Sequence, residues 1–283
     1  MNLNLLIENL TNPALLFFVL GVLAVMVKSD LEIPPGSSKF ISLYLLFSIG
    51  FKGGQELAHS TFDMQIIWAV ILGVALSMLI PLYTFFILKR KLNIFDSGAI
   101  AAAYGSVSAV TFVTAISFLE VQNISFSGHM VAVMALMEAP AIIVGVILIK
   151  MYADKKESKE SEGSLKEIIS HSVTNSSVLL ILGSLVIGYL ANDQAAQGIK
   201  PFTTDLFKGF LAIFLLDMGI VSGRKLKDFF QSGWFAAAFA VIVPFINGCV
   251  VAVISGWFLD DIGDRFILAV LAASASYIAV PAA

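Results

Sequence analysis

The chain has 283 residues, of which 58% are hydrophobic and only 13% are charged. Soluble domains average about 45–50% apolar and about 25% charged residues, so a soluble enzyme, a nucleic-acid-binding protein and a disordered chain are all excluded. The formal net charge of −3 is too small to indicate a polyanionic partner. The single cysteine, Cys249, excludes a disulfide scaffold and a cysteine metal cage. Because the apolar residues fall in long runs, we expect an all-α polytopic membrane protein in a lipid bilayer.

A membrane-spanning helix needs about 20 apolar residues to cross the hydrocarbon core. The spans that we expect lie at 13–28, 37–56, 64–88, 96–119, 128–151, 177–192, 202–223, 232–259 and 264–283. The first is expected to be a mature helix rather than a cleaved signal peptide, since no basic segment precedes it and Asn12-Pro13 is typical of a helix start. The polar segment 153–176, which contains KKESKESEGSLKE, is predicted to be a solvated linker loop.

The basic residues predict how the chain is oriented. Of the 17 Lys and Arg residues, 13 fall in one alternating set of loops. Cytoplasmic loops carry the excess of Lys and Arg in membrane proteins. We therefore expect the N-terminus to lie outside the cell and the linker 153–176 to lie in the cytoplasm.

The two halves of the chain, 1–152 and 177–283, resemble each other in their polar and glycine residues. The segment Ser48–Gly54 aligns with Asp217–Gly223 at an offset of 169 positions, and three further pairs align at an offset of 168, namely Asp96 with Asp264, Ser106 with Ser274 and Ser108 with Ser276. Because each half would have an odd number of spans, the halves would cross the membrane in opposite directions. The sequence thus predicts a five-plus-five inverted-repeat transporter. Such a repeat needs a tenth span, which would require about 35–40 residues after the last residue given.

Small and hydroxyl residues interrupt two equivalent spans. In the fourth span these are Gly105, Ser106, Ser108 and Thr111, and in the ninth they are Ser274, Ser276 and Tyr277, followed by Pro281. Small residues also allow close helix packing, which is the structural alternative. We interpret the two segments as discontinuous crossing helices whose amides and hydroxyls bind an anion, because half-helix N-termini favour negative charge.

Two carboxylates lie deep in apolar runs, Glu138 in ALMEAPAI and Asp217 in IFLLDMGI. A carboxylate at this depth costs at least about 2.5–3.5 kcal/mol, so it is expected to face a cation, a cavity or a partner. A sodium ion or a proton is the natural candidate; the alternatives are an ion pair with Lys52 or Lys208 and a permanently protonated acid. Enzyme motifs such as HExxH are lacking, so we expect no catalytic residues and no cofactor apart from the coupling ion. The histidines His59, His129 and His171 lie at span edges or in the central loop and are expected to be interfacial rather than catalytic.

At these residues the sequence resembles the SbtA-type sodium-dependent bicarbonate transporters, best known from cyanobacteria. The resemblance rests on five segments in order: NPALLFFVLG, SLYLLFSIGFKGG, AAAYGSVSAVTF, ALMEAPAIIVG and ASYIAVPAA. It implies a homotrimer in the bacterial plasma (inner) membrane in which sodium drives bicarbonate inward as one domain slides against another. It also implies control of inorganic carbon uptake by a PII-like cytoplasmic regulator that senses adenine nucleotides.

The resemblance places the substrate between the two crossing segments, at the seven residues named above. The regulator would then meet the linker 153–176 and the basic patch Arg224–Lys227. The residues themselves support only a small planar oxyanion. A transporter of another oxyanion or carboxylate, coupled to sodium or protons, therefore stays open. So do an anion channel and a membrane sensor whose output is the linker.

Overall fold

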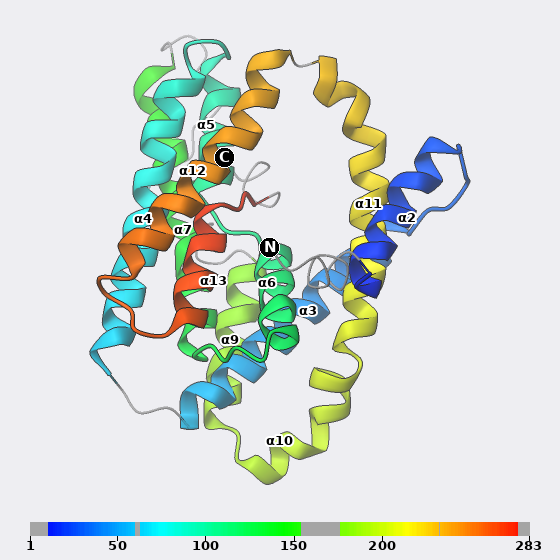
Figure 1. Ribbon diagram of the computed structural model, residues 1–283, viewed down its shortest axis with the longest axis vertical. Coiled ribbons are helices and arrows are strands. Elements are labelled where there is room, and N and C mark those ends of the chain that lie inside the picture. The colour runs from blue at the N-terminus through cyan, green and yellow to red at the C-terminus, as the bar shows by residue number, and fades with distance from the viewer. Residues whose placement is uncertain (1–10, 60–62, 154–175, 232, 277–283) are drawn as a thin grey trace.

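The computed structural model describes residues 11–59, 63–153, 176–231 and 233–276, and within them every regular element is helical (Figure 1). The α-helices of the first half are α2 (Pro13–Met26), α3 (Pro35–His59), α4 (Met64–Leu88), α5 (Ile94–Gly105), α6 (Ala109–Val121) and α7 (His129–Tyr152). Those of the second half are α9 (Ser176–Leu190), α10 (Asp193–Lys200), α11 (Phe207–Gln231), α12 (Trp234–Ser255) and α13 (Ile262–Ala272), with the π-helical turn η2 (Pro201–Asp205) before α11. The linker 153–176 lies outside the described residues except for its two ends.

Four helical stretches in the described part are long and apolar enough to cross a membrane: Met64–Leu88, His129–Tyr152, Asp193–Leu226 and Trp234–Ser255. Two further apolar helices, Pro13–Met26 and Leu179–Leu190, are shorter. The expectation of an all-helical, multi-pass membrane protein is thereby confirmed. The count of nine spans stays a prediction, because the fourth expected span is divided into α5 and α6 and the ninth is described only as far as residue 276.

The most apolar helices occupy two different environments. In α12 the large side chains of Trp234, Val241 and Phe245 are 86%, 69% and 71% exposed. In α7, which is similarly apolar, most side chains are buried. A helix that is hydrophobic all round is either buried in protein or surrounded by lipid. We conclude that α12 faces lipid and that α7 lies at the centre of the molecule.

The helices pack as two bodies. The paired-helix body contains α2 packed along α11 and α3 packed along α9, with α10 and η2 at its lower end (Figure 1). The broken-helix body contains α4, α5 and α7, which pack on one another, together with α6, α12 and α13. Contacts of α7 with α3 and α9 join the two bodies.

Glycines let the paired helices approach at backbone distance. A Cβ atom on Gly219 of α11 would lie only 2.1 Å from the carbonyl oxygen of Phe18 in α2, and one on Gly188 of α9 would lie 2.1 Å from that of Phe51 in α3. Gly50 of α3, the residue that aligns with Gly219 in the sequence, is likewise packed against the backbone of α9. Small residues serve the same purpose between membrane helices generally. Aligned glycines thus make equivalent contacts in the two helix pairs.

We expect Gly219→Ala to destabilise the protein by about 2 kcal/mol, because the added methyl group meets backbone that cannot turn aside. Gly209→Ala, one turn into the same helix, is the matched control, since nothing lies within 4 Å of its Cβ position. That change should stabilise α11 by up to about 1 kcal/mol, because alanine is the better helix former. Thermal unfolding in detergent measures both. Equal effects of the two changes would contradict the close packing of α2 and α11.

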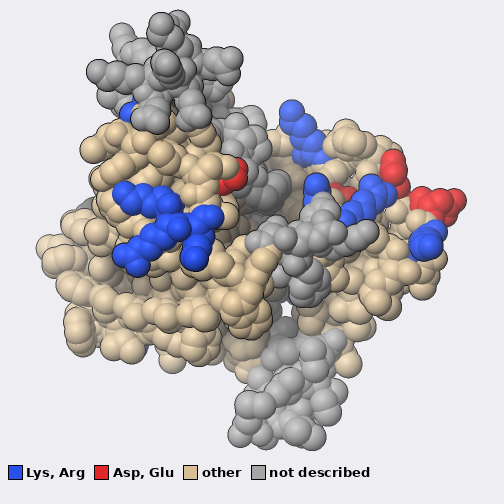
Figure 2. Space-filling view, turned by 90° about the horizontal axis from the view of Figure 1, so that it is seen from above, with Lys and Arg blue, Asp and Glu red and all other residues tan. Residues whose placement is uncertain are grey.

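Most of the basic residues in the described part of the chain lie toward one end of the molecule. The helix ends that carry Lys28, Lys89–Lys91 and Arg224–Lys225 lie in the upper half of Figure 1, and Figure 2 shows two groups of Lys and Arg on the face seen from above. At this end the Lys89 ammonium lies 3.9 Å from the centre of the Tyr152 ring. Lysine beside aromatic rings is typical of the membrane–water interface. The predicted alternation of basic and non-basic loops therefore agrees with the fold, while the assignment of this end to the cytoplasm stays a prediction.

Candidate functional site

The fourth expected span is broken at its centre. The helix α5 ends at Gly105, where a Cβ atom would meet the Pro81 ring of α4 at 2.1 Å, and the chain is extended at Ser106. A new helix, α6, then begins at Ala109. Ser108 caps it, since its Oγ accepts a hydrogen bond of 3.2 Å from the amide of Thr111. Serine is a preferred residue at a helix N-cap, and glycine is favoured where backbone must pack closely. The predicted discontinuity of this helix is confirmed.

The segment after α13 crosses this break. The amide of Ser108 donates to Ser274 Oγ at 3.1 Å, and the amide of Ser276 donates to the Ala103 carbonyl at 2.8 Å. In an unbroken helix that carbonyl would accept from the amide four residues later, in Val107. The amide of Ser276 donates to this carbonyl instead. The carbonyl left without its helical partner by the break in the first half is thus hydrogen-bonded by the crossing segment of the second half. All four serines of the two segments, Ser106, Ser108, Ser274 and Ser276, are buried.

Both signs of helix dipole meet at this crossing. The C-terminal ends of α5 and α13 point toward it from the upper and lower ends of the molecule, whereas α6 begins there with its N-terminal end (Figure 1). A helix C-terminus carries about half a negative charge and an N-terminus about half a positive one. The crossing therefore suits a cation and an anion side by side.

Glu138 lies level with the break. The helices α5 and α7 are antiparallel, and the contacts between them, in order toward the break, join Gly98 to Ile149, Ala102 to Gly145 and Gly105 to Ala141. The next turn of α7 in this direction carries Glu138. Its side chain is buried, and Oε1 has no hydrogen-bond partner among the described residues. The same is true of Oγ of Ser106 at the break itself.

Asp217, the second carboxylate expected to bind sodium, lies in the other body. It is buried in α11, and its carboxylate accepts a hydrogen bond from the hydroxyl of Ser38 in the first turn of α3. Lys208, one of the ion-pair partners considered, precedes it by nine residues on the same helix, which is about 13 Å along the axis. The fold thus places Asp217 in the paired-helix body and Glu138 in the broken-helix body, where the contacts of α7 with α5 put Glu138 next to the broken helix.

The other predicted site residues can be placed in part. Gly105, Ser106, Ser108, Ser274 and Ser276 come together at the crossing. Thr111 is half-buried in the first turn of α6, where its amide is held by Ser108. Tyr277 lies outside the described residues.

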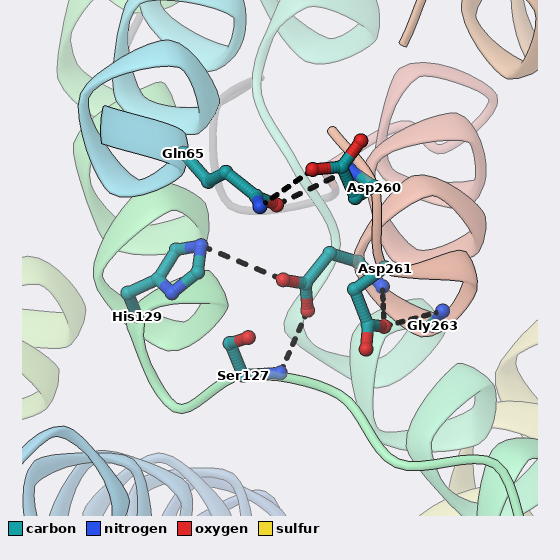
Figure 3. A network of polar contacts seen from close by, with 7 residues as sticks. Gln65, Ser127, His129, Asp260, Asp261 and Gly263 are labelled. Atoms are coloured by element: carbon teal, nitrogen blue, oxygen red, sulfur yellow. Dashed lines mark hydrogen bonds and ion pairs between the residues drawn. The ribbon is translucent and has the colours of Figure 1, made fainter. Parts of the chain in front are cut away.

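Sequence reasoning missed a polar network at the lower end of the broken-helix body (Figure 3). Asp264 in the first turn of α13 is buried, accepts a hydrogen bond of 2.7 Å from the amide of Ser127, and lies 3.6 Å from Nε2 of His129. The side chain of Gln65 holds Asp260 nearby, at 2.9 Å. His129 lies at the start of a span, as expected, and its side chain is buried. Its distance of 135 residues from Asp264 in sequence left no local signal for the pair.

A broken helix that a second segment crosses at a buried polar centre, in an all-helical multi-pass protein, is typical of secondary transporters. Comparison with known families agrees with this class. The chain belongs to the Na⁺-dependent bicarbonate transporter superfamily, whose family model matches residues 13–283. No curated protein matches the chain. The family membership confirms the resemblance found in the sequence, and it implies sodium-dependent transport of bicarbonate rather than catalysis.

Proposed function

We propose that this protein carries bicarbonate into the cell by symport with sodium, and that both ions bind at the crossing of the two broken segments. The observation that carries the proposal is the hydrogen-bonded crossing of residues 103–108 with 274–276, in a chain that belongs to a sodium-dependent bicarbonate transporter family. The N-terminal end of α6 and the buried serines favour the anion. Tyr277 is a further candidate for contact with the anion.

Sodium is proposed to bind beside Glu138. A hard cation prefers oxygen ligands, and two buried oxygens without partners among the described residues, Oε1 of Glu138 and Oγ of Ser106, belong to this region. The negative ends of α5 and α13 add to the attraction. Asp217 is not proposed to bind this sodium ion, because it already accepts a hydrogen bond from Ser38 in the other body. It remains a candidate ligand for a separate cation site.

We further propose an elevator-like movement within an inverted repeat. The broken-helix body contains the whole crossing and would carry the bound ions past the paired-helix body. The repeat is supported by Asp96 and Asp264, which both lie in the first turn of a half-helix, and by Ser106 and Ser274, which both follow the end of one. In this proposal the repeats are 1–152 and 177–283. A homotrimer in the inner membrane, an external N-terminus and a PII-like regulator at the cytoplasmic linker complete the scheme.

Uptake of labelled bicarbonate into proteoliposomes tests the function. We expect saturable uptake that needs an inward sodium gradient and is not inhibited by nitrate, sulfate or acetate. Sodium-driven uptake of one of these competitors in place of bicarbonate would support the symport mechanism and show that the substrate is a different anion. Flux that does not saturate and proceeds equally well without sodium would indicate a channel. No uptake of any anion would overturn the proposal.

A further inference from the structure

A cavity lined by both apolar and polar side chains lies toward the lower end of the molecule. It has a volume of about 170 Å³, and its polar lining comes from Ser48, Lys52 and Glu56 of α3, Thr203 and Thr204 of η2, and Lys208 of α11. The lining residues include two lysines and one glutamate, so their formal charges leave the cavity positive at neutral pH. This cavity is large enough for an ion of four heavy atoms together with water.

The cavity lies between the two bodies. Its other wall is formed by Ile116 of α6, Phe126 of the loop before α7, and Val131 of α7, all of which belong to the broken-helix body. Ile116 follows Ser108 by eight residues, so the cavity lies about 12 Å from the break along α6. An anion in this cavity would therefore be close to the crossing and on the side where the two bodies meet.

The two lysines that line the cavity, Lys52 and Lys208, lie in a different part of the molecule from most other basic residues. Most basic residues of the described part lie toward the opposite end, whereas Lys52 lies within the expected span 37–56 and Lys208 lies in the candidate span Asp193–Leu226. Charged residues inside membrane segments usually face a cavity and mark the path of an ion. Lysine supplies three donors and hydroxyl groups supply more, which suits the oxygens of an oxyanion.

We propose that this cavity, formed by Lys52, Lys208, Thr203 and Thr204, is a vestibule that binds a small monovalent oxyanion before it reaches the crossing. The proposal rests on the proposed function, since it takes bicarbonate as the anion. It adds a second anion site that is weaker than the site at the crossing. The vestibule attracts the anion by its positive charge, so binding there does not require sodium. An excess of positive charge in a cleft raises the local concentration of an anionic substrate and its rate of association.

Transport kinetics give the first test. In the double variant Lys52→Gln/Lys208→Gln we expect the apparent KM for bicarbonate to rise by about 3- to 10-fold, with the maximal rate changed by less than about 2-fold. Lys52→Arg/Lys208→Arg should restore the KM, because it retains both charges. Lys200→Gln is the matched control, since Lys200 ends α10 at the same end of the molecule but does not line the cavity. An unchanged KM in the double glutamine variant, with sodium-dependent uptake intact, would overturn the vestibule.

Chemical protection gives a test that needs no transport. Ile116→Cys in a Cys249→Ser background keeps both lysines, removes the exposed native cysteine and leaves one thiol at the cavity. We expect bicarbonate, in sodium-free buffer, to slow the reaction of this thiol with a negatively charged sulfonate reagent by about 3-fold or more, whereas gluconate at equal ionic strength should not. Equal rates with the two anions would contradict the proposal. Because sodium is absent, this result is distinguishable from a failure of sodium-driven uptake in the parent protein.

Discussion

Glu138→Gln is expected to reduce sodium-driven bicarbonate uptake by at least about 10-fold while leaving the protein folded. The substitution keeps the shape of the side chain and removes the charge that attracts the cation. Oε1 of Glu138 has no hydrogen-bond partner among the described residues, so little else in the fold depends on the carboxylate. An ionised carboxylate is costly at this depth, and the neutral amide should therefore leave the melting temperature unchanged or raise it.

Sodium-dependent thermal stabilisation provides a readout apart from transport. A ligand at ten times its dissociation constant stabilises the folded state by about 1.4 kcal/mol, and Glu138→Gln should lose this effect of sodium. Asp217→Asn is the matched comparison, because Asp217 is an equally buried carboxylate that already accepts from Ser38. We expect Asp217→Asn to retain sodium-dependent uptake. Full sodium dependence in Glu138→Gln would remove Glu138 from the coupling site, and its loss in Asp217→Asn alone would transfer the role to α11.

Asp264→Ala is expected to destabilise the protein by about 3 kcal/mol. The change leaves the amide of Ser127 without its buried acceptor and removes the carboxylate beside His129, whose side chain is also buried. Because α13 begins at this network and ends at the crossing, we also expect the loss of bicarbonate uptake.

The aligned residue in the other half gives the control for this change. Asp96 occupies the same position in the first turn of α5, but it is exposed, and its hydrogen bonds in the described structure are with Asn93. Asp96→Ala should therefore cost less than about 1 kcal/mol. Thermal unfolding in detergent compares the two variants. Similar costs for both changes would show that the buried network around Asp264 adds nothing to stability.

The sequence alone was sufficient for the class of protein, for the approximate bounds of most of the described helices and for the break in the fourth span, but it did not predict α10 or the full extent of α11. Long apolar runs leave only helices as a solution in lipid, because every backbone amide must be satisfied within the chain. Gly105 suits the end of one helix, and Ser108 suits the start of the next. The local sequence at positions 105–108 therefore predicts the break without any knowledge of the tertiary structure. Family membership was also evident from five short segments, and comparison confirmed it.

Only the tertiary structure decided which polar residues meet. The pairing of Ser276 with Ala103, of Asp264 with Ser127 and of Asp217 with Ser38 joins positions more than a hundred residues apart. Hydrophobic periodicity contains no information about such pairs, since every face of a membrane helix is apolar. Asp217 and Glu138 therefore looked alike in sequence, as carboxylates in apolar runs, and the packing of α11 on α2 and of α7 on α5 separates them. The helix register, set by glycines that admit backbone contact, places Glu138 at the break and Asp217 beside α3.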